Sequence, residues 1–379
     1  MPEATPWWEQ FRDEMPIVDR WAYFDHAAVA PMSGAAQQAM TEFARDMAEN
    51  GEAHWSQWRK RVEHLRRLGS KLLGCDSGEI AVVRNTTEGI NLVSEGFPWR
   101  AGDNVVTLDA EFPSNRFPWL MLADRGVETR QVATDNERID VDRIAQSCDA
   151  RTRLISVSWV GYATGWRNDL DDLVAMAHQR GAYLFVDAIQ GLSAFPLDVG
   201  STPIDFLAAD GHKWMLGPEG AGLFYMRAEH TQLLRPMGVG WNSVQNAGDY
   251  ASRGMELKQS AARYEGGSYN LAGIAGLAAS LDRLLEFGVE NIADRIVQVT
   301  DELCERLTTM GAEVASCRES QRSSGIVAFT LPHGSPQELK RQCLEQGVVI
   351  NCRAGRLRVS PHVYNNLADI EKLFDALTA

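Results

Sequence analysis

The chain lacks the features that mark several large classes of protein. Its six cysteines are scattered through 379 residues without a CxxC pair, which argues against a structural zinc site and against a disulfide framework. No apolar run approaches the roughly 20 residues that a membrane span needs. The N-terminus has no basic segment followed by an apolar one, so it does not resemble a signal peptide. From these absences we expect a soluble, cytoplasmic protein without a membrane partner.

Basic residues are also scarce. The chain has 37 lysines and arginines against 51 aspartates and glutamates, and its net charge is −14. Such a charge disfavours binding to nucleic acid, whose phosphates are negative. The glycine-rich run GPEGAG at 217–222 lacks the Gly-Lys-Ser/Thr ending of a nucleotide-binding loop, and no cluster of histidines, cysteines and carboxylates has the spacing of a metal site. We therefore expect neither a nucleic-acid partner nor a metal.

Short apolar runs alternate with amphipathic segments along most of the chain. The runs lack strict polar alternation, as expected for strands that are covered on both faces. Repeated strand–helix units predict an α/β fold with a mostly parallel, doubly wound sheet. The expected strands are 79–83, 104–108, 153–160, 182–188, 205–209 and 222–226.

The pattern changes after about residue 255, where a long helical region at 270–311 precedes two more apolar runs and a final helix. We expect a large α/β domain over 20–255. Residues 1–19 and 256–379 are expected to form a smaller α/β domain.

Polar side chains stand where strands of the large sheet are expected to end, and open α/β sheets bind ligands at the carboxyl ends of their strands. Asn85 can cap a helix that begins with Thr86 and Thr87, and Glu88 can return the bond as in a capping box. Free N–H groups and the helix dipole favour a phosphate at such a terminus. Taken alone, however, this is an ordinary helix cap.

Two further strand ends carry Asp187 and Lys213. Desolvation lowers the pKa of a buried lysine, which can then act as a nucleophilic amine towards an aldehyde. Taken singly, Asp187 fits a salt bridge and Lys213 a solvated surface group. Near the C-terminus, Arg356 and Arg358 alternate on an extended segment, and either could hold a carboxylate through a bidentate contact.

One ligand accounts for all of these groups. Pyridoxal phosphate needs a carboxylate to keep its ring nitrogen protonated, a lysine to hold its aldehyde as a Schiff base and a site for its phosphate. Asp187, Lys213 and the Thr86–Thr87 helix start supply these. Arg358 would hold the carboxylate of a small amino-acid substrate.

Four motifs together resemble the class V aminotransferase family: NTTEGINLV, VDAIQG, DGHKWMLGPEGAGLFY and RYEGGSYN. The resemblance covers about residues 20–375, and the family includes cysteine desulfurases, isopenicillin-N-epimerase-like proteins and kynureninase. It implies a homodimer of the fold type I, aspartate-aminotransferase-like class. It also implies roles for single residues: Lys213 carries the cofactor, Asp187 contacts the ring nitrogen, Gln190 contacts the ring hydroxyl, Thr87 and His212 bind the phosphate, Arg358 binds the substrate carboxylate, and Ser268 reaches the phosphate of the neighbouring subunit.

Several residues depart from the desulfurase pattern that this resemblance suggests. Phe112 stands where desulfurases usually stack a histidine on the cofactor, and a phenylalanine carries no proton. Desulfurases also need a cysteine on a loop, whereas Cys352 lies only six residues before Arg358 and is expected to be structural. Trp159 replaces an asparagine that touches the cofactor hydroxyl in many relatives. Asp210 replaces a phosphate-binding serine, which requires that His212 be protonated or that Asp210 point away. These departures suit the epimerase-like branch better.

His26 is expected near the mouth of the site, where it contacts the substrate or is satisfied within its own loop. For the whole chain we expect an aminotransferase, in which Lys213 moves a proton between the substrate Cα and the cofactor C4′. An epimerase, or a C–S or β-eliminating lyase of the desulfurase type, begins with the same steps and stays an alternative. A non-catalytic dimeric binding module is a third, and the presence of Lys213, Asp187 and Arg358 argues against it.

Overall fold

The computed structural model describes residues 6–379. Its largest sheet has seven strands in the order β2-β8-β7-β6-β5-β3-β4, and β8 alone runs antiparallel to its neighbours in that sheet. The predicted α/β fold with a mostly parallel sheet is therefore confirmed. The strands are β2 (Ile80–Val83), β3 (Asn104–Leu108), β4 (Glu128–Val132), β5 (Thr152–Ser158), β6 (Tyr183–Asp187), β7 (Phe206–Asp210) and β8 (Gly222–Met226).

Helices cover both faces of this sheet, because successive strand residues point to opposite sides. Leu184 and Val186 pack into one apolar core, and Phe185 between them packs into another. The first core includes residues from α3, α6, α7 and α8, and the second includes α4 and α5. These helices are α3 (Trp55–Leu73), α4 (Thr86–Gly96), α5 (Phe117–Leu120), α6 (Val141–Ser147), α7 (Leu170–Gln179) and α8 (Leu271–Phe287).

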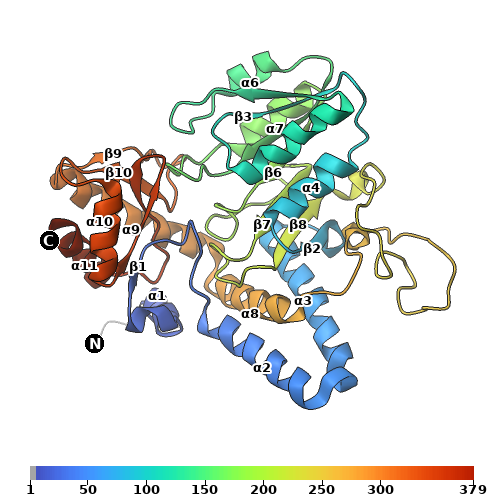
Figure 1. The fold of residues 1–379 in the computed structure, drawn as a ribbon, viewed down its shortest axis with the longest axis horizontal. Coiled ribbons are helices and arrows are strands. Elements are labelled where there is room, and N and C mark those ends of the chain that lie inside the picture. The colour runs from blue at the N-terminus through green and yellow to red at the C-terminus, as the bar shows by residue number, and fades with distance from the viewer. Residues whose placement is uncertain (1–5) are drawn as a thin grey trace.

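A smaller sheet lies to one side of the large one (Figure 1). It is antiparallel in the order β12-β13-β10-β9, and the short pair β1-β11 accompanies it. Its strands are β9 (Glu313–Val314), β10 (Val327–Thr330), β12 (Asn351–Arg353) and β13 (Arg356–Val359), with β1 (Ala22–Tyr23) and β11 (Val348–Val349) as the pair. The remaining helices are α1 (Trp7–Asp13), α2 (Gly34–Asn50), α9 (Val289–Thr309), α10 (Pro336–Glu345) and α11 (Leu367–Thr378).

The division into domains at residue 255 stays a proposal. Helix α8 follows that position in the chain but packs on the first core of the large sheet. Helix α9 contributes both to that core and to a third core, formed with strands of the smaller sheet. The expected helical region at 270–311 is interrupted at Gly288, whose φ of 84° separates α8 from α9.

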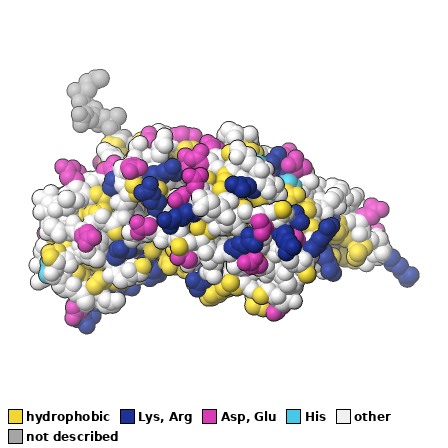
Figure 2. Space-filling view, turned by 90° about the horizontal axis from the view of Figure 1, so that it is seen from above, with side chains coloured by type: hydrophobic (Ala, Val, Ile, Leu, Met, Phe, Trp, Pro, Cys, Tyr) yellow, Lys and Arg dark blue, Asp and Glu magenta, His cyan; other side chains and the backbone are white. Residues whose placement is uncertain are grey.

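The surface mixes charge signs. On the face that Figure 2 shows, acidic and basic side chains are interspersed with apolar ones. None of the described helices is long and apolar enough to cross a membrane.

Candidate active site

A cavity of about 260 Å³ opens where strands β6 and β7 of the large sheet end. This is the edge at which a parallel sheet is expected to bind ligands. Eight of the residues singled out from the sequence line it: Thr86, Thr87, Phe112, Asp187, Gln190, His212, Lys213 and Arg358. Trp159, His26 and Ser268 do not.

Lys213 follows strand β7 and is only 9% exposed. Burial lowers the pKa of its amine to about 8, while the charge of Asp187 opposes that shift and the charge of Arg358 adds to it. The approach to the lysine requires Gly211, because a Cβ there would lie 2.7 Å from the carbonyl oxygen of Ala221. A larger residue would push the lysine away from the end of its strand.

Asp187 ends strand β6 and is buried at 3% exposure. Burial raises the pKa of its carboxyl to about 6, against the lowering effects of the Ile189 N–H and of Lys213. The Ile189 N–H donates to Oδ1 at 3.1 Å, and it is the only hydrogen-bond donor to this carboxylate among the described residues. A carboxylate that faces a cavity with one donor suits a protonated ring nitrogen.

The N-terminus of α4 forms a second wall of the cavity. Asn85 caps it by accepting from the Glu88 N–H at 2.8 Å. The expected return bond differs, because the Glu88 carboxylate accepts from the N–H and guanidinium of Arg84 rather than from Asn85. Thr86 Oγ1 accepts from the Asp210 N–H at 3.0 Å, and Thr87 remains at the cavity wall. The helix start is thus tied to the end of β7.

His212 and Asp210 line the same wall. The two side chains approach to 3.0 Å between Nδ1 and Oδ2, outside hydrogen-bond geometry. His212 Nδ1 and Asp210 Oδ1 are both buried without a hydrogen-bond partner among residues 6–379. The unpartnered Nδ1 of His212 beside the helix N-terminus fits a phosphate, whereas the Asp210 carboxylate offers it no donor. The residues at both ends of the cavity therefore fit pyridoxal phosphate.

Two predicted residues, Gln190 and Trp159, are engaged with the protein itself. Gln190 lines the cavity, but its amide donates to the Ala27 carbonyl and accepts from the Trp214 indole, both at 2.9 Å. Trp159 packs against the backbone of Gly191, where a Cβ would lie 2.3 Å from its ring. The ring-hydroxyl contact proposed for Gln190 and the cofactor contact proposed for Trp159 stay proposals.

His26 is fully buried behind the cavity. Its ring nitrogens lie 2.8 Å from the Ser360 carbonyl oxygen and 2.7 Å from the Tyr364 hydroxyl. Residues Ala27 to Val29, which follow it, do line the cavity. His26 is thus satisfied within the protein and holds this segment, while its predicted substrate contact stays a proposal.

Arg358 is 1% exposed and reaches the cavity from the smaller sheet. Its Nη1 donates to the Tyr162 carbonyl at 2.6 Å, and its Nη2 lies 3.2 Å from Asp25 Oδ1. Asp25 was not foreseen from the sequence, because it lies more than 300 residues away in the chain. The pair fixes the guanidinium at the cavity wall, and its predicted contact with a substrate carboxylate stays a proposal.

Glu111 is another buried acid that sequence reasoning missed. It accepts from the Ser158 N–H at 2.7 Å and from the Ser158 hydroxyl. Burial raises the pKa of its carboxyl to about 7. Ser158 pairs with Asp187 across strands β5 and β6 and lines the cavity. The sequence signal that could have identified Glu111 is its position directly before Phe112, which was already predicted to lie at the site.

Ser268 lines a different cavity, of about 800 Å³, on the other side of the α4 N-terminus. Asn85 and Thr87 line both cavities. A phosphate role for Ser268 across a subunit interface, and the homodimer itself, stay predictions.

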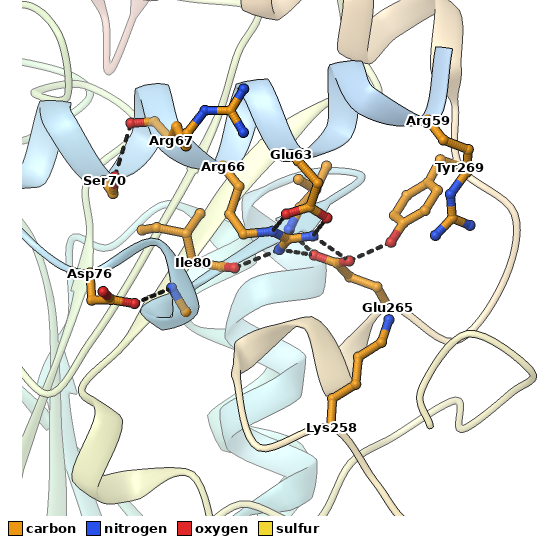
Figure 3. Close-up of polar contacts among 12 residues, drawn as sticks. Arg59, Glu63, Arg66, Arg67, Ser70, Asp76, Ile80, Lys258, Glu265 and Tyr269 are labelled. Atoms are coloured by element: carbon orange, nitrogen blue, oxygen red, sulfur yellow. Dashed lines mark hydrogen bonds and ion pairs between the residues drawn. The ribbon is translucent and has the colours of Figure 1, made fainter. Parts of the chain in front are cut away.

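The segment that carries Ser268 is anchored by a buried ion pair (Figure 3). Arg66 on α3 donates to both carboxylate oxygens of Glu265, at 2.6 and 2.9 Å. The same carboxylate accepts from the Val82 N–H at 2.7 Å and from the Tyr269 hydroxyl. Helix α3, strand β2 and the 265–269 segment are thereby held together.

The chain matches known proteins along nearly its whole length. The family model described as Aminotransferase class-V matches residues 22–373. A probable cysteine desulfurase from Methanothermobacter thermautotrophicus is 30% identical over 391 residues, covering 97% of each chain.

Solved structures show the same architecture. The cysteine desulfurase CsdA from Escherichia coli, in its S-sulfonic acid form, superposes with a TM-score of 0.88 at 26% identity, covering 99% of this chain and 98% of that one. A variant of C-DES, a cystine C–S lyase, with glycine covalently linked to its pyridoxal phosphate superposes with a TM-score of 0.91 at 22% identity, covering 97% and 98%. The expected fold type I is thus confirmed. From the family match and the geometry around Lys213, this chain is an enzyme of the class V aminotransferase family, and its cofactor is pyridoxal phosphate.

Proposed function

We propose that the protein is a C–S lyase that acts on a small, sulfur-containing L-α-amino acid. It releases the sulfur as part of a small-molecule product and does not transfer it to a cysteine of the protein. A relative that is 30% identical is a probable cysteine desulfurase, which favours cleavage of a carbon–sulfur bond over transamination. Transamination and epimerisation stay alternatives without a specific observation in their favour.

The position of Cys352 carries the second half of this proposal. It lies in β12, opposite Leu357 of β13, and only Ala354 and Gly355 connect Arg353 to Arg356 in this tight hairpin. Its thiol donates to the Pro336 carbonyl at 3.0 Å, away from the cavity, and burial raises its pKa. No cysteine lines the Lys213 cavity in the described chain. A protein thiol is thus not at hand to accept sulfur.

The residues of the cavity divide the work. Bound pyridoxal phosphate supplies an electron-withdrawing ring that accepts the electron pair left at the substrate Cα. Asp187 keeps a proton on the ring nitrogen, and Arg358 orients the substrate carboxylate. Lys213 removes the Cα proton, because its lowered pKa of about 8 makes the free amine available closer to neutral pH than that of an ordinary lysine.

Phe112 lines the cavity but has no group that can donate or accept a proton. Its ring lies 5.8 Å from Lys213 Nζ and 5.4 Å from the Tyr162 ring. Acid–base work at the substrate carbon therefore falls mainly to Lys213. In the overall reaction the Cα–H and Cβ–S bonds break, so that L-cysteine and water give pyruvate, ammonia and hydrogen sulfide.

The test is a product assay of the holoprotein with L-cysteine and with L-cystine. We expect pyruvate and ammonia in equal amounts, with hydrogen sulfide from cysteine and cysteine persulfide from cystine. Cys352→Ser should form these products at the parent rate, and Lys213→Ala should form none. If Cys352→Ser stopped the release of sulfur, Cys352 would be a relay thiol and the second half of the proposal would fall.

A further inference from the structure

The hairpin that supplies Arg358 presents a row of arginines on one face. Asn351 pairs with Arg358 across β12 and β13, and Arg353 pairs with Arg356. Directly paired residues in an antiparallel hairpin point to the same side, as do alternate residues of one strand. Arg353, Arg356 and Arg358 therefore share a face.

These three arginines line two different cavities. Arg353 and Arg358 both line the Lys213 cavity. Arg356 lines a separate cavity and donates to the Asn136 side chain at 3.0 Å. The Lys213 cavity thus receives two guanidinium groups from one rigid hairpin.

Arg353 differs from Arg358 in its partners. Arg358 has the carboxylate of Asp25 at 3.2 Å. The half-buried Arg353 has no carboxylate within 4.0 Å among the described residues. It donates through Nη1 to two neutral acceptors, the Asn351 amide oxygen at 2.9 Å and the Cys352 carbonyl at 2.8 Å. Its Nε and Nη2, one edge of the planar fork that binds carboxylates, have no hydrogen-bond partner among residues 6–379.

The charge of Arg353 is felt inside the cavity. It adds to the lowering of the pKa of both Lys213 and Arg358. No carboxylate lies within 4.0 Å of Arg353 in the described chain, and the more distant Asp25 offsets only part of the cost of holding this cation beside two other cationic groups. An anionic ligand would lower that cost further.

We propose that Arg353 binds a second acidic group of the substrate, so that the enzyme selects sulfur amino acids with a carboxylate beyond the sulfur atom. Diagonal neighbours in a hairpin are typically about 7–8 Å apart, which matches a ligand whose two acids flank a thioether or disulfide. This inference rests on the proposed function, since it names the substrate class of that site.

An isosteric pair of ligands isolates the second charge. S-carboxymethyl-L-cysteine and its amide, S-carbamoylmethyl-L-cysteine, differ only in a carboxylate against a neutral amide. We expect the holoprotein to bind the acid at least about tenfold more tightly, measured as the change in cofactor absorbance on titration, and to show the same preference in kcat/KM for pyruvate release. Tenfold corresponds to the loss of one hydrogen bond between charged groups.

Three variants assign this preference to one side chain. Arg353→Gln should remove the preference for the acid, and Arg353→Lys should retain part of it because the charge remains. Arg356→Gln, on the same hairpin face but outside the cavity, should keep the parent preference. Equal binding of acid and amide by the parent protein overturns the inference, as does a preference that survives in Arg353→Gln. Equal weakening of both ligands in that variant would instead place Arg353 on the α-carboxylate.

The same data separate this inference from the proposed function. The titration measures binding and needs no elimination. A tenfold binding preference without pyruvate would contradict the lyase proposal and support the second acid site. Pyruvate from both ligands at equal rates and affinities would support the lyase proposal and contradict the second acid site.

Discussion

Burial shifts the pKa values of Lys213 and Asp187 towards each other. The lysine pKa falls to about 8 and the aspartate pKa rises to about 6, because burial penalises the charged form of both groups. Their mutual attraction offsets part of each shift. The outcome at neutral pH is a carboxylate that can hold a proton on a bound ring and an amine that can lose one.

The lowered lysine pKa predicts how the apoenzyme captures its cofactor. The reactive free amine increases as pH rises through about 8 rather than through the ordinary value of 10.5. The rate at which apoprotein and pyridoxal phosphate form the bound chromophore should therefore rise up to about pH 8–9 and then level. Stopped-flow absorbance measures this rate, with Lys213→Ala as the blank. A rate that keeps rising tenfold per pH unit to pH 10 would mean that the lysine is not desolvated.

Replacing the Asp187 carboxylate tests its electrostatic role. Asp187→Asn keeps the shape and the Ile189 contact but removes the charge that faces the ring nitrogen. We expect kcat to fall about a hundredfold to a thousandfold, as for the loss of one preorganised electrostatic group. Circular dichroism should show an unchanged fold. Parent-like turnover in this variant would show that Asp187 does not face the ring.

Strand ends are the part of the site that a sequence predicts well. Asp187 and Lys213 each follow a recognisable apolar run, and parallel strands bring such positions together. The partners Asp25 and Arg353 could not be found in this way. Asp25 and Arg358 are hundreds of residues apart in the chain. The side of the hairpin to which Arg353 points depends on the register of the two strands.

At the scale of elements, the site depends on how loops are tied to the sheet. The 265–269 segment borders the α4 N-terminus and is held by Arg66 from α3. Arg66 also contacts Glu63, which is 60% exposed, whereas the Glu265 side chain is 1% exposed. The two acids thus offer a matched comparison of one arginine with a buried and an exposed partner.

Removing the buried partner should be far more costly. Glu265→Gln leaves the Arg66 charge buried without its main counter-charge, and breaking such a pair costs about 3–5 kcal/mol. Glu63→Gln should change the free energy of unfolding by about 0–1 kcal/mol. Urea denaturation monitored by circular dichroism measures both. Equal losses in the two variants would contradict an anchoring role for Glu265.

For the whole molecule, two buried histidines join the N-terminal segment to the C-terminal one. His362 lies 3.2 Å from the Trp214 carbonyl oxygen through Nε2, and its ring stacks on Phe11 and Trp214. His26 lies beside it, with a ring centroid 5.3 Å away. Burial lowers the pKa of both, that of His362 from 6.5 to about 4. Both rings are therefore neutral in the folded protein.

Acid should destabilise the fold through these rings. Between pH 6.5 and about 4 the unfolded chain binds a proton at position 362 that the folded chain does not, so stability is full above this window and falls as pH decreases. His362→Phe should remove up to about 3 kcal/mol of that pH dependence. Denaturant titrations at both ends of the window measure it, and the raised pKa values of Asp187 and Glu111, which act oppositely, are common to both chains. Parallel pH profiles for parent and variant would contradict the assignment.

The apolar pattern of the sequence predicted strand bounds best where a strand is buried at every residue. Strands β3 and β8 have the predicted bounds, and both are buried at every residue. Strand β4 was missed because it lies at the sheet edge, and only Val132 of its five residues is buried. The break at Gly288 was missed because both flanking segments continue the helical pattern.

The most direct test of the account is the fate of the carbon–sulfur bond. The holoprotein would be incubated with L-cystine, and every carbon product identified by proton NMR in one sample. The account predicts pyruvate and cysteine persulfide, with no keto acid that retains sulfur. A sulfur-containing keto acid, formed together with loss of the bound chromophore and restored by a second keto acid, would establish an aminotransferase and contradict the central claim.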